Sequence, residues 1–247
     1  MRIPRKITPD GLTDAVVLVR YTSASIPPQA VFGGIYQVLI EQGFSYLPSA
    51  SQKEELAASV QIFFNEAGVV VGSQSGQLWF NGVTVVDEPA AEAGRYIGWA
   101  AYQQVLASVL EPLLSRNIIH QLVSVSVRYV NILPWQPRAE QVNFALAVPL
   151  SEDAGPSPTI DYRVSWPTNA EGYRIRLRIT DQLKRRSGQQ AVKGTLFDVE
   201  IVCRPDGNDF VALGVAIERA HQKQKEVFFG LLSPAFLGSL QPEYDPA

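Results

Sequence analysis

The chain has very little cysteine or histidine. Its 247 residues include one cysteine, Cys203, and two histidines, His120 and His221. A lone cysteine excludes a disulfide framework within the chain and a zinc site built from several cysteines, and it is typical of proteins in a reducing cytoplasm. The first apolar run, residues 15–19, is too short for a signal-sequence core or a membrane span. We therefore expect a cytoplasmic protein with no membrane partner.

Motifs that mark common enzymes are missing as well. The chain has no glycine-rich phosphate loop, no histidine pair spaced on a helix and no zinc-ligand spacing, so we expect no cofactor and no metal. Residues 72–76 resemble a nucleophile elbow in outline, but Gln74 stands midway between the two glycines, where that motif needs a serine. An enzyme is therefore the least favoured class, and its candidate catalytic residues are His221 and Arg128.

Charge is scarce and unevenly placed. Only 18% of the residues are charged, and the net charge of −3 argues against bulk attraction to nucleic acid or anionic lipid. Residues 173–194, however, hold seven basic residues against one acid, a local net charge of +6. Four of these bases lie in the predicted loop of a hairpin without matching acids: Lys184, Arg185, Arg186 and Lys193. They are candidates for binding phosphate or nucleic acid, and a merely solvated loop is the alternative.

Apolar patterning is what the sequence does contain, with 46% hydrophobic residues. Alternation and turn residues predict strands at 15–21, 60–64, 69–72, 77–86, 121–133, 141–150, 159–166, 173–181 and 195–203. Spacing by three and four predicts main helices at 28–42, 93–116 and 213–231, and Ser233-Pro234 predicts the start of a short one. Because most strands follow one another directly, we expect an α+β fold, with a mostly antiparallel sheet of about eight or nine strands and three main helices packed on one face.

No linker rich in proline or glycine divides the chain. We expect a single domain over residues 1–247, in which 1–116 and 117–247 are two possible halves. The sequence has no internal repeat of fixed period.

One histidine lies where an apolar residue is expected. His221 falls on the inward face of the predicted helix 213–231, in step with Ile217 and Phe228. A buried polar group without a partner costs about 1 to 3 kcal/mol, so His221 needs a partner or a task. It is interpreted either as a neutral histidine that anchors the helix to the sheet or as a general base. Candidate members of its polar cluster lie on the predicted strand 121–133: Arg128, Tyr129 and Asn131.

Two carboxylates of the predicted strand 195–203 also admit two interpretations. Asp198 and Glu200 share one strand face and could form an acid–base pair. The neighbouring strand of the hairpin presents arginines at the same two-residue period: Arg174, Arg176 and Arg178. Cross-strand ion pairs are the commoner cause of such a pattern, and we favour them.

Three segments resemble a known family. Residues 127–131 read Val-Arg-Tyr-Val-Asn, residues 3–7 read Ile-Pro-Arg-Lys-Ile, and the last long helix carries His221 followed by Phe228. These motifs are similar to those of a sporadically distributed family of bacterial proteins of similar length. The chain departs from that pattern at Ile132, where a basic residue is common, and after Phe228, where an acidic one is common. The resemblance implies a mobile-element or defence-related gene neighbourhood, and it implies no activity, cofactor or substrate.

Taken together, these features favour a non-catalytic protein that binds another protein or associates with itself. Nucleic-acid binding through residues 184–193 is the first alternative, and an enzyme that uses His221 is the second.

Overall fold

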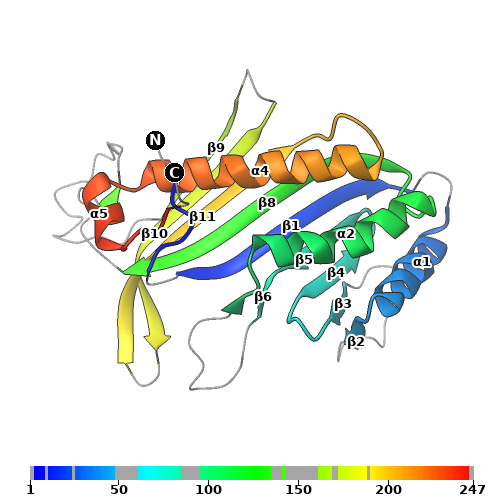
Figure 1. Cartoon of the computed structure of the whole chain (residues 1–247), viewed down its shortest axis with the longest axis horizontal. Helices are drawn as coiled ribbons and strands as arrows, with labels where there is room; N and C mark the ends of the chain where they lie inside the picture. Colours follow the sequence, from blue (N-terminus) through cyan, green and yellow to red (C-terminus); the bar gives the residue numbers. More distant parts are fainter. Residues whose placement is uncertain are drawn as a thin grey trace.

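A nine-stranded antiparallel sheet frames the molecule (Figure 1). The computed structural model describes residues 3–8, 11–23, 26–47, 60–84, 95–134, 141–142, 161–168, 172–187 and 190–244. The strands of the sheet are β1 Leu12–Thr22, β2 Ser45–Leu47, β3 Gln61–Phe64, β4 Val70–Gln74, β5 Gln77–Asn81, β8 Gln121–Pro134, β9 Asp161–Pro167, β10 Arg174–Ser187 and β11 Gln190–Cys203. Their order across the sheet is β2-β3-β4-β5-β1-β8-β11-β10-β9. The predicted α+β class and large antiparallel sheet are confirmed.

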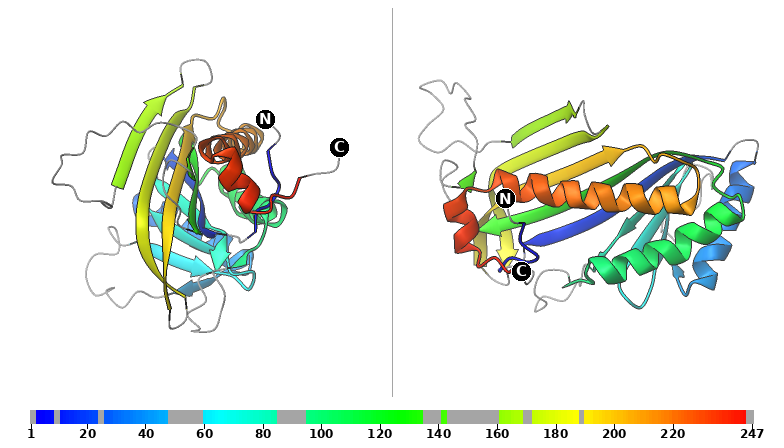
Figure 2. Two further views of the ribbon diagram at one scale, coloured as in Figure 1. Left: turned by 90° about the vertical axis from the view of Figure 1, so that its left-hand side faces the viewer. Right: turned by 45° about the horizontal axis from the view of Figure 1, so that its top comes forward.

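The helices gather on one face of this sheet (Figures 1 and 2). They are α1 Pro28–Glu41, α2 Trp99–Ser115, α4 Phe210–Leu231 and the short α5 Pro234–Ser239. α4 packs on β8 and β11, and α2 contacts both α1 and α4. A small two-stranded sheet, β6 Val83–Thr84 and β7 Arg95–Tyr96, precedes α2. The opposite face of the large sheet carries no helix in the described part of the chain.

The core lies between the helices and the central strands. Alternate residues of β1, β8 and β11 point toward the helices and are almost fully buried: Val17, Val19, Val125, Val127, Phe197 and Val199. Burying one large apolar side chain stabilises a fold by about 1.5 to 3 kcal/mol, so this layer holds the helices on the sheet. The period of two leaves the intervening side chains on the helix-free face.

The two halves of the chain have the same strand topology. In each, a first strand is followed by a meander whose last strand returns beside it, and then by a covering helix: β1 with β3, β4, β5 and α2, and β8 with β9, β10, β11 and α4. The first strands meet at the centre as an antiparallel pair, with Val17 opposite Val127. This topological repeat is invisible in the sequence because alternation records which face a residue takes and not which strand lies beside it.

Local chemistry sets the helix ends. Pro28 takes the first position of α1, where its missing N–H costs nothing. The Asp209 carboxylate caps α4 by accepting from Ala212 N at 2.8 Å, and Ser233 caps α5 by accepting from Phe236 N at 3.1 Å. Past the end of α2, Asn117 adopts φ of 54°, a left-handed conformation that asparagine tolerates.

Two expectations from the sequence are wrong, and a third lies mostly outside the described residues. The long helix begins at Trp99 and not near residue 93, because Gly98, with φ of 87°, breaks the helical backbone and residues 95–96 form β7. The basic residues 184–186 and 193 lie on the paired strands of the β10–β11 hairpin and not in a long loop. Of the predicted strand 141–150, residues 143–150 lie outside the described residues, and Val142 forms one isolated bridge with Leu232.

Candidate functional site

His221 is 5% exposed and lies on α4, where it faces α2 and β8. Its Nδ1 lies 3.1 Å from the hydroxyl oxygen of Tyr129 on β8, which is one of the three candidate partners named from the sequence. Its ring stacks on the indole of Trp99, which opens α2. The Tyr129 hydroxyl also lies 3.0 Å from that of Tyr96, so a short chain of polar groups runs from α4 to β7. One histidine thus joins three elements of the fold.

A carboxylate one helical turn away completes this cluster. Glu218 Oε2 accepts hydrogen bonds from Trp99 Nε1 at 2.8 Å and Gln103 Nε2 at 2.7 Å, and Oε1 accepts from Gln222 Nε2. Although burial acts to raise the pKa of Glu218, these hydrogen bonds hold it below its usual value. Glu218 therefore fixes the indole against which His221 stacks.

The environment keeps His221 neutral. Burial lowers its pKa from 6.5 to about 4, and the nearby carboxylate of Glu218 opposes only part of that shift. Burial likewise raises the pKa of Tyr129 well above its usual value, so both partners are uncharged at neutral pH. Neither of the two hollows described below is lined by His221. The arrangement resembles that of Tyr102 in α2, whose hydroxyl donates to Phe80 O at 2.8 Å and accepts from Val17 N at 3.2 Å.

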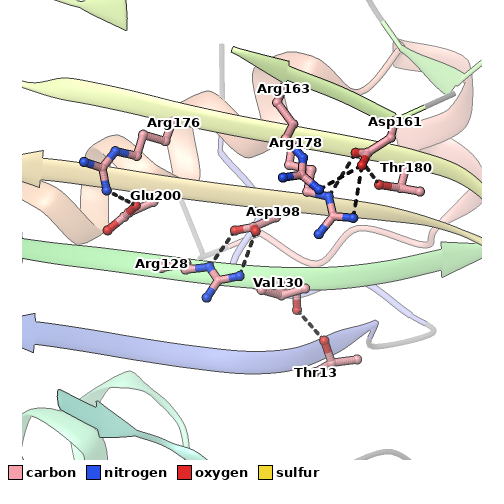
Figure 3. A network of polar contacts seen from close by, with 10 residues as sticks. All are labelled: Thr13, Arg128, Val130, Asp161, Arg163, Arg176, Arg178, Thr180, Asp198 and Glu200. Carbon is pink, nitrogen blue, oxygen red and sulfur yellow. Dashed lines mark hydrogen bonds and ion pairs between the residues drawn. The ribbon is translucent and has the colours of Figure 1, made fainter. Parts of the chain in front are cut away.

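Arg128 points the other way. Because side chains alternate along β8, Arg128 lies on the helix-free face, away from His221, and forms a bidentate ion pair with Asp198 with both distances 2.8 Å (Figure 3). Asn131 is buried further along β8, opposite Phe197. Of the four residues grouped from the sequence, the structure brings Tyr129 and His221 into contact and places Arg128 in a different site.

A ladder of ion pairs crosses the C-terminal half of the helix-free face (Figure 3). Arg176 pairs with Glu200 at 3.0 Å, as expected for hairpin neighbours. Arg178 pairs with Asp161 of β9 rather than with Asp198, which Arg128 takes from the other side. The strand β11 is interior, so its acids can pair with β10 on one side or with β8 on the other. The sequence pattern indicates only the neighbour β10. Hydrogen bonds from Arg178 and Arg163 lower the pKa of Asp161.

The N-terminal half of the same face is apolar. One row straight across the strands runs Leu47, Ile62, Gly72, Trp79 and Leu18. A Cβ at Gly72 would lie 1.9 Å from Trp79 Cε2, so the indole lies directly over this glycine. Leu47 is 50% exposed, and Phe64 in the next row is 43% exposed.

The charged and apolar halves meet in one broad hollow of about 970 Å³. Its lining takes Val16, Leu18 and Trp79 from the apolar side and the ion-pair ladder from the other side. The charged groups of this lining are five arginines and two carboxylates: Arg20, Arg128, Arg163, Arg176, Arg178, Asp198 and Glu200. We call this surface the groove. A positively biased, partly apolar groove suits a ligand that carries both apolar and acidic groups.

The basic hairpin is formed by the connected ends of the interior strands β10 and β11. Lys184 pairs with Lys193, Arg185 with Val192 and Arg186 with Ala191 in the strand ladder. The two lysines occupy directly opposed positions, where like charges destabilise pairing. No acid occurs between residues 182 and 193.

Within the described ranges, no group of three or more histidine, cysteine, aspartate or glutamate side chains is placed to hold a metal ion. None of the helices described is long and apolar enough to cross a membrane. Comparisons with protein-family models, with curated proteins and with solved structures find no match to this chain.

Sequence reasoning missed several members of both sites. Trp99 and Glu218 both support His221. The sequence signal for Trp99 is an aromatic residue at the start of a helix, and the signal for Glu218 is an acid three residues before the histidine. Trp79 is recognisable in principle because its strand carries bulky side chains at successive positions, so that one of them must face away from the helices. Asp161 gives no signal, since its partner Arg178 is 17 residues distant.

Proposed function

We propose that this chain is a non-catalytic binding protein that takes an acidic and apolar segment of a partner protein into the groove. The observation that carries the proposal is that Trp79 and Leu18 lie beside several arginines in one hollow. This hollow is on the face of the sheet that no described helix covers (Figure 2). Tryptophan and arginine are the residues that contribute most to protein–protein interfaces. The buried, neutral state of His221 supports a structural role for that residue and removes one motive for an enzyme.

Two features favour a protein over a nucleic acid as the occupant. Four of the five groove arginines already pair with carboxylates, namely Arg128, Arg163, Arg176 and Arg178, so less positive charge is free to neutralise phosphates. Trp79 covers Gly72 and does not stand out as a platform for bases. A second copy bound through the same face is disfavoured as well, because two arginine-rich linings would oppose each other.

A peptide selection tests this proposal. Linear peptides displayed on phage are selected against the purified protein, and the enriched peptides are measured by fluorescence anisotropy. We expect sequences that combine acidic and apolar residues, and we expect Trp79→Ala and Arg128→Ala each to weaken binding at least tenfold. Arg219→Ala is the matched control, since Arg219 is exposed on α4 and pairs with Asp206 far from the groove.

Peptides that bind the Trp79→Ala protein as tightly as the wild type would contradict the proposal. A mass in solution of twice the chain that falls to one chain in Trp79→Ala would instead identify a second copy as the occupant. Both measurements use the same purified wild-type and variant proteins.

Nucleic-acid binding through the basic hairpin is the second candidate. It rests on the four basic residues and the absence of acids in residues 182–193 and on the opposed positions of Lys184 and Lys193. It predicts a gel shift with DNA or RNA at low salt that is weakened, with a flatter salt dependence, by replacing Arg185 and Arg186 with glutamate. The absence of any shift for the wild type would exclude it.

A further inference from the structure

A second hollow lies beside α1, and Gln74 is the one described residue that lines both this hollow and the groove. It has a volume of about 200 Å³ and is bounded by the first half of α1, the end of β1, the start of β3 and the turn between β4 and β5. One wall is apolar, from Val31, Phe32 and Ile35 of α1. The most buried polar residues of its lining are Tyr21, Gln61 and Ser73, each no more than 5% exposed. We call this hollow the α1 pocket.

Gln61 is the anomalous group in this lining. It is 3% exposed, and its Oε1 has no hydrogen-bond partner among the described residues. An unsatisfied buried amide costs about 1 to 3 kcal/mol, so folded proteins rarely keep one without a compensating partner. Gln61 sits directly opposite Ser73 in the β3–β4 ladder, and both face the α1 pocket. The wall of the pocket therefore holds an acceptor that the described part of the chain leaves unpaired; this Oε1 is enclosed by its neighbours, so the Gln61 side chain must turn toward the pocket to meet a ligand.

The lining limits what can satisfy that acceptor. Its described members include no aspartate, glutamate, lysine, arginine or histidine, so none of them offers a counter-ion to a charged ligand. The Gln61 carboxamide has a hydrogen-bond acceptor, Oε1, beside a donor, Nε2. A planar ligand group with a donor beside an acceptor can therefore form two hydrogen bonds with it. Nucleobase edges and primary carboxamides have this arrangement, and glutamine pairs with adenine in this way.

Size and position agree with such a ligand. A volume of about 200 Å³ is below the roughly 300 to 1,000 Å³ typical of sites for drug-sized ligands, which restricts the occupant to one small ring or a comparable group. The first turn of α1, at Pro28 and Gln29, borders the same space and has no side-chain cap, so it favours an acceptor on the ligand. We infer that the α1 pocket binds a neutral molecule of nucleobase size through a donor–acceptor edge that pairs with the Gln61 amide. This site is independent of the groove.

A small probe set tests the inference on the full chain. Adenine and cytosine represent nucleobases, nicotinamide represents carboxamides, and benzoate is the charged control of similar size. Binding is measured by saturation-transfer NMR and titrated by chemical-shift change on labelled protein. We expect at least one neutral probe to bind with a dissociation constant of about 1 mM or lower, and benzoate not to bind.

Matched variants tie the binding to the pocket. Gln61→Leu keeps the side-chain volume and removes the amide, and we expect it to weaken the bound probe at least tenfold. Gln224→Leu is the control, because Gln224 is 1% exposed and has an unpartnered Nε2 but lines neither hollow. Ile35→Phe, which narrows the pocket from the α1 wall, should also abolish binding.

The outcomes separate cleanly. Binding by the bases alone identifies a nucleobase-type ligand, and binding by nicotinamide alone identifies a carboxamide, such as a glutamine or asparagine side chain. Failure of every neutral probe at 10 mM, a concentration about tenfold above the expected constant, overturns the inference, as does equal binding by wild type and Gln61→Leu. None of these results depends on whether a peptide occupies the groove.

Discussion

The imidazole of His221 lies flat against the indole of Trp99, with ring centroids 3.7 Å apart and planes 13° from parallel. The same imidazole is hydrogen-bonded to Tyr129, and the same indole donates to Glu218. The stack therefore ties the start of α2 to the middle of α4 and both helices to β8. Such coupled contacts contribute more together than the sum of their separate removals indicates.

We expect His221→Ala to lower the free energy of unfolding by about 2 to 4 kcal/mol, since it removes a buried ring and leaves a cavity beside Trp99. His221→Phe keeps a stackable ring and should cost less, about 1 to 2 kcal/mol, because the Tyr129 hydroxyl retains Tyr96 as a partner. Urea titrations followed by circular dichroism measure both. Equal losses for the two variants would show that the ring stack contributes nothing.

Stability should fall as the pH drops below about 6.5. The unfolded chain takes up a proton on His221 near pH 6.5, whereas the folded chain resists until about pH 4, so folding is penalised progressively between these values. The full effect is on the order of 3 kcal/mol. Urea titrations at several pH values check it, and His221→Phe should show a shallower slope between pH 6.5 and 4. An identical slope would mean that other groups, Glu218 first among them, carry the dependence.

Gly72→Ala should destabilise the fold by about 1 to 3 kcal/mol, because the added Cβ overlaps the Trp79 indole and forces it out of place. The loss should shrink in the double variant with Trp79→Ala, where the overlap is gone. A double-mutant cycle from thermal or urea unfolding gives the coupling between the two positions. Additive losses would place the strain in the backbone and not in the indole.

Gln61→Leu should raise the free energy of unfolding of the ligand-free protein by about 1 kcal/mol, because it removes a buried amide whose acceptor is unsatisfied. Gln224→Leu should act in the same direction for its unpartnered Nε2. Calorimetry of each variant against the wild type provides the measurement. A loss of stability in Gln61→Leu would indicate that the amide has a partner outside the described residues.

The elements were easier to predict than their arrangement. Alternation found β8 because Val125, Val127 and Tyr129 are buried toward the helices, although Val123 at the start of the pattern is exposed. The same alternation cannot say that β1 lies between β5 and β8, since any strand with the right faces satisfies it. The start of α2 was misplaced because the left-handed backbone of Gly98 overrides a run of residues that favour helix.

The candidate sites divide in the same way. That His221 needs a partner on the sheet was predictable because a polar residue on a buried helix face must be satisfied, but the sequence did not choose Tyr129 over Arg128 and Asn131. The partner of Arg128 was not, because Asp198 is 70 residues away and pairs through a neighbouring strand. The orphaned acceptor of Gln61 is a property of packing, and a glutamine in a strand gives no sign of it.

The pairing of β1 with β8 has a consequence for synthesis. As the chain emerges from its N-terminus, β1 can pair with β5 on one edge, but its other edge stays open until β8 is made. An unpaired edge of an apolar strand is a template for association between chains. Contacts this distant in sequence also slow folding. The nascent chain that has β1 but not yet β8 is therefore the species most prone to aggregation. Stalling translation before β8 is synthesised should increase the binding of chaperones to this nascent chain.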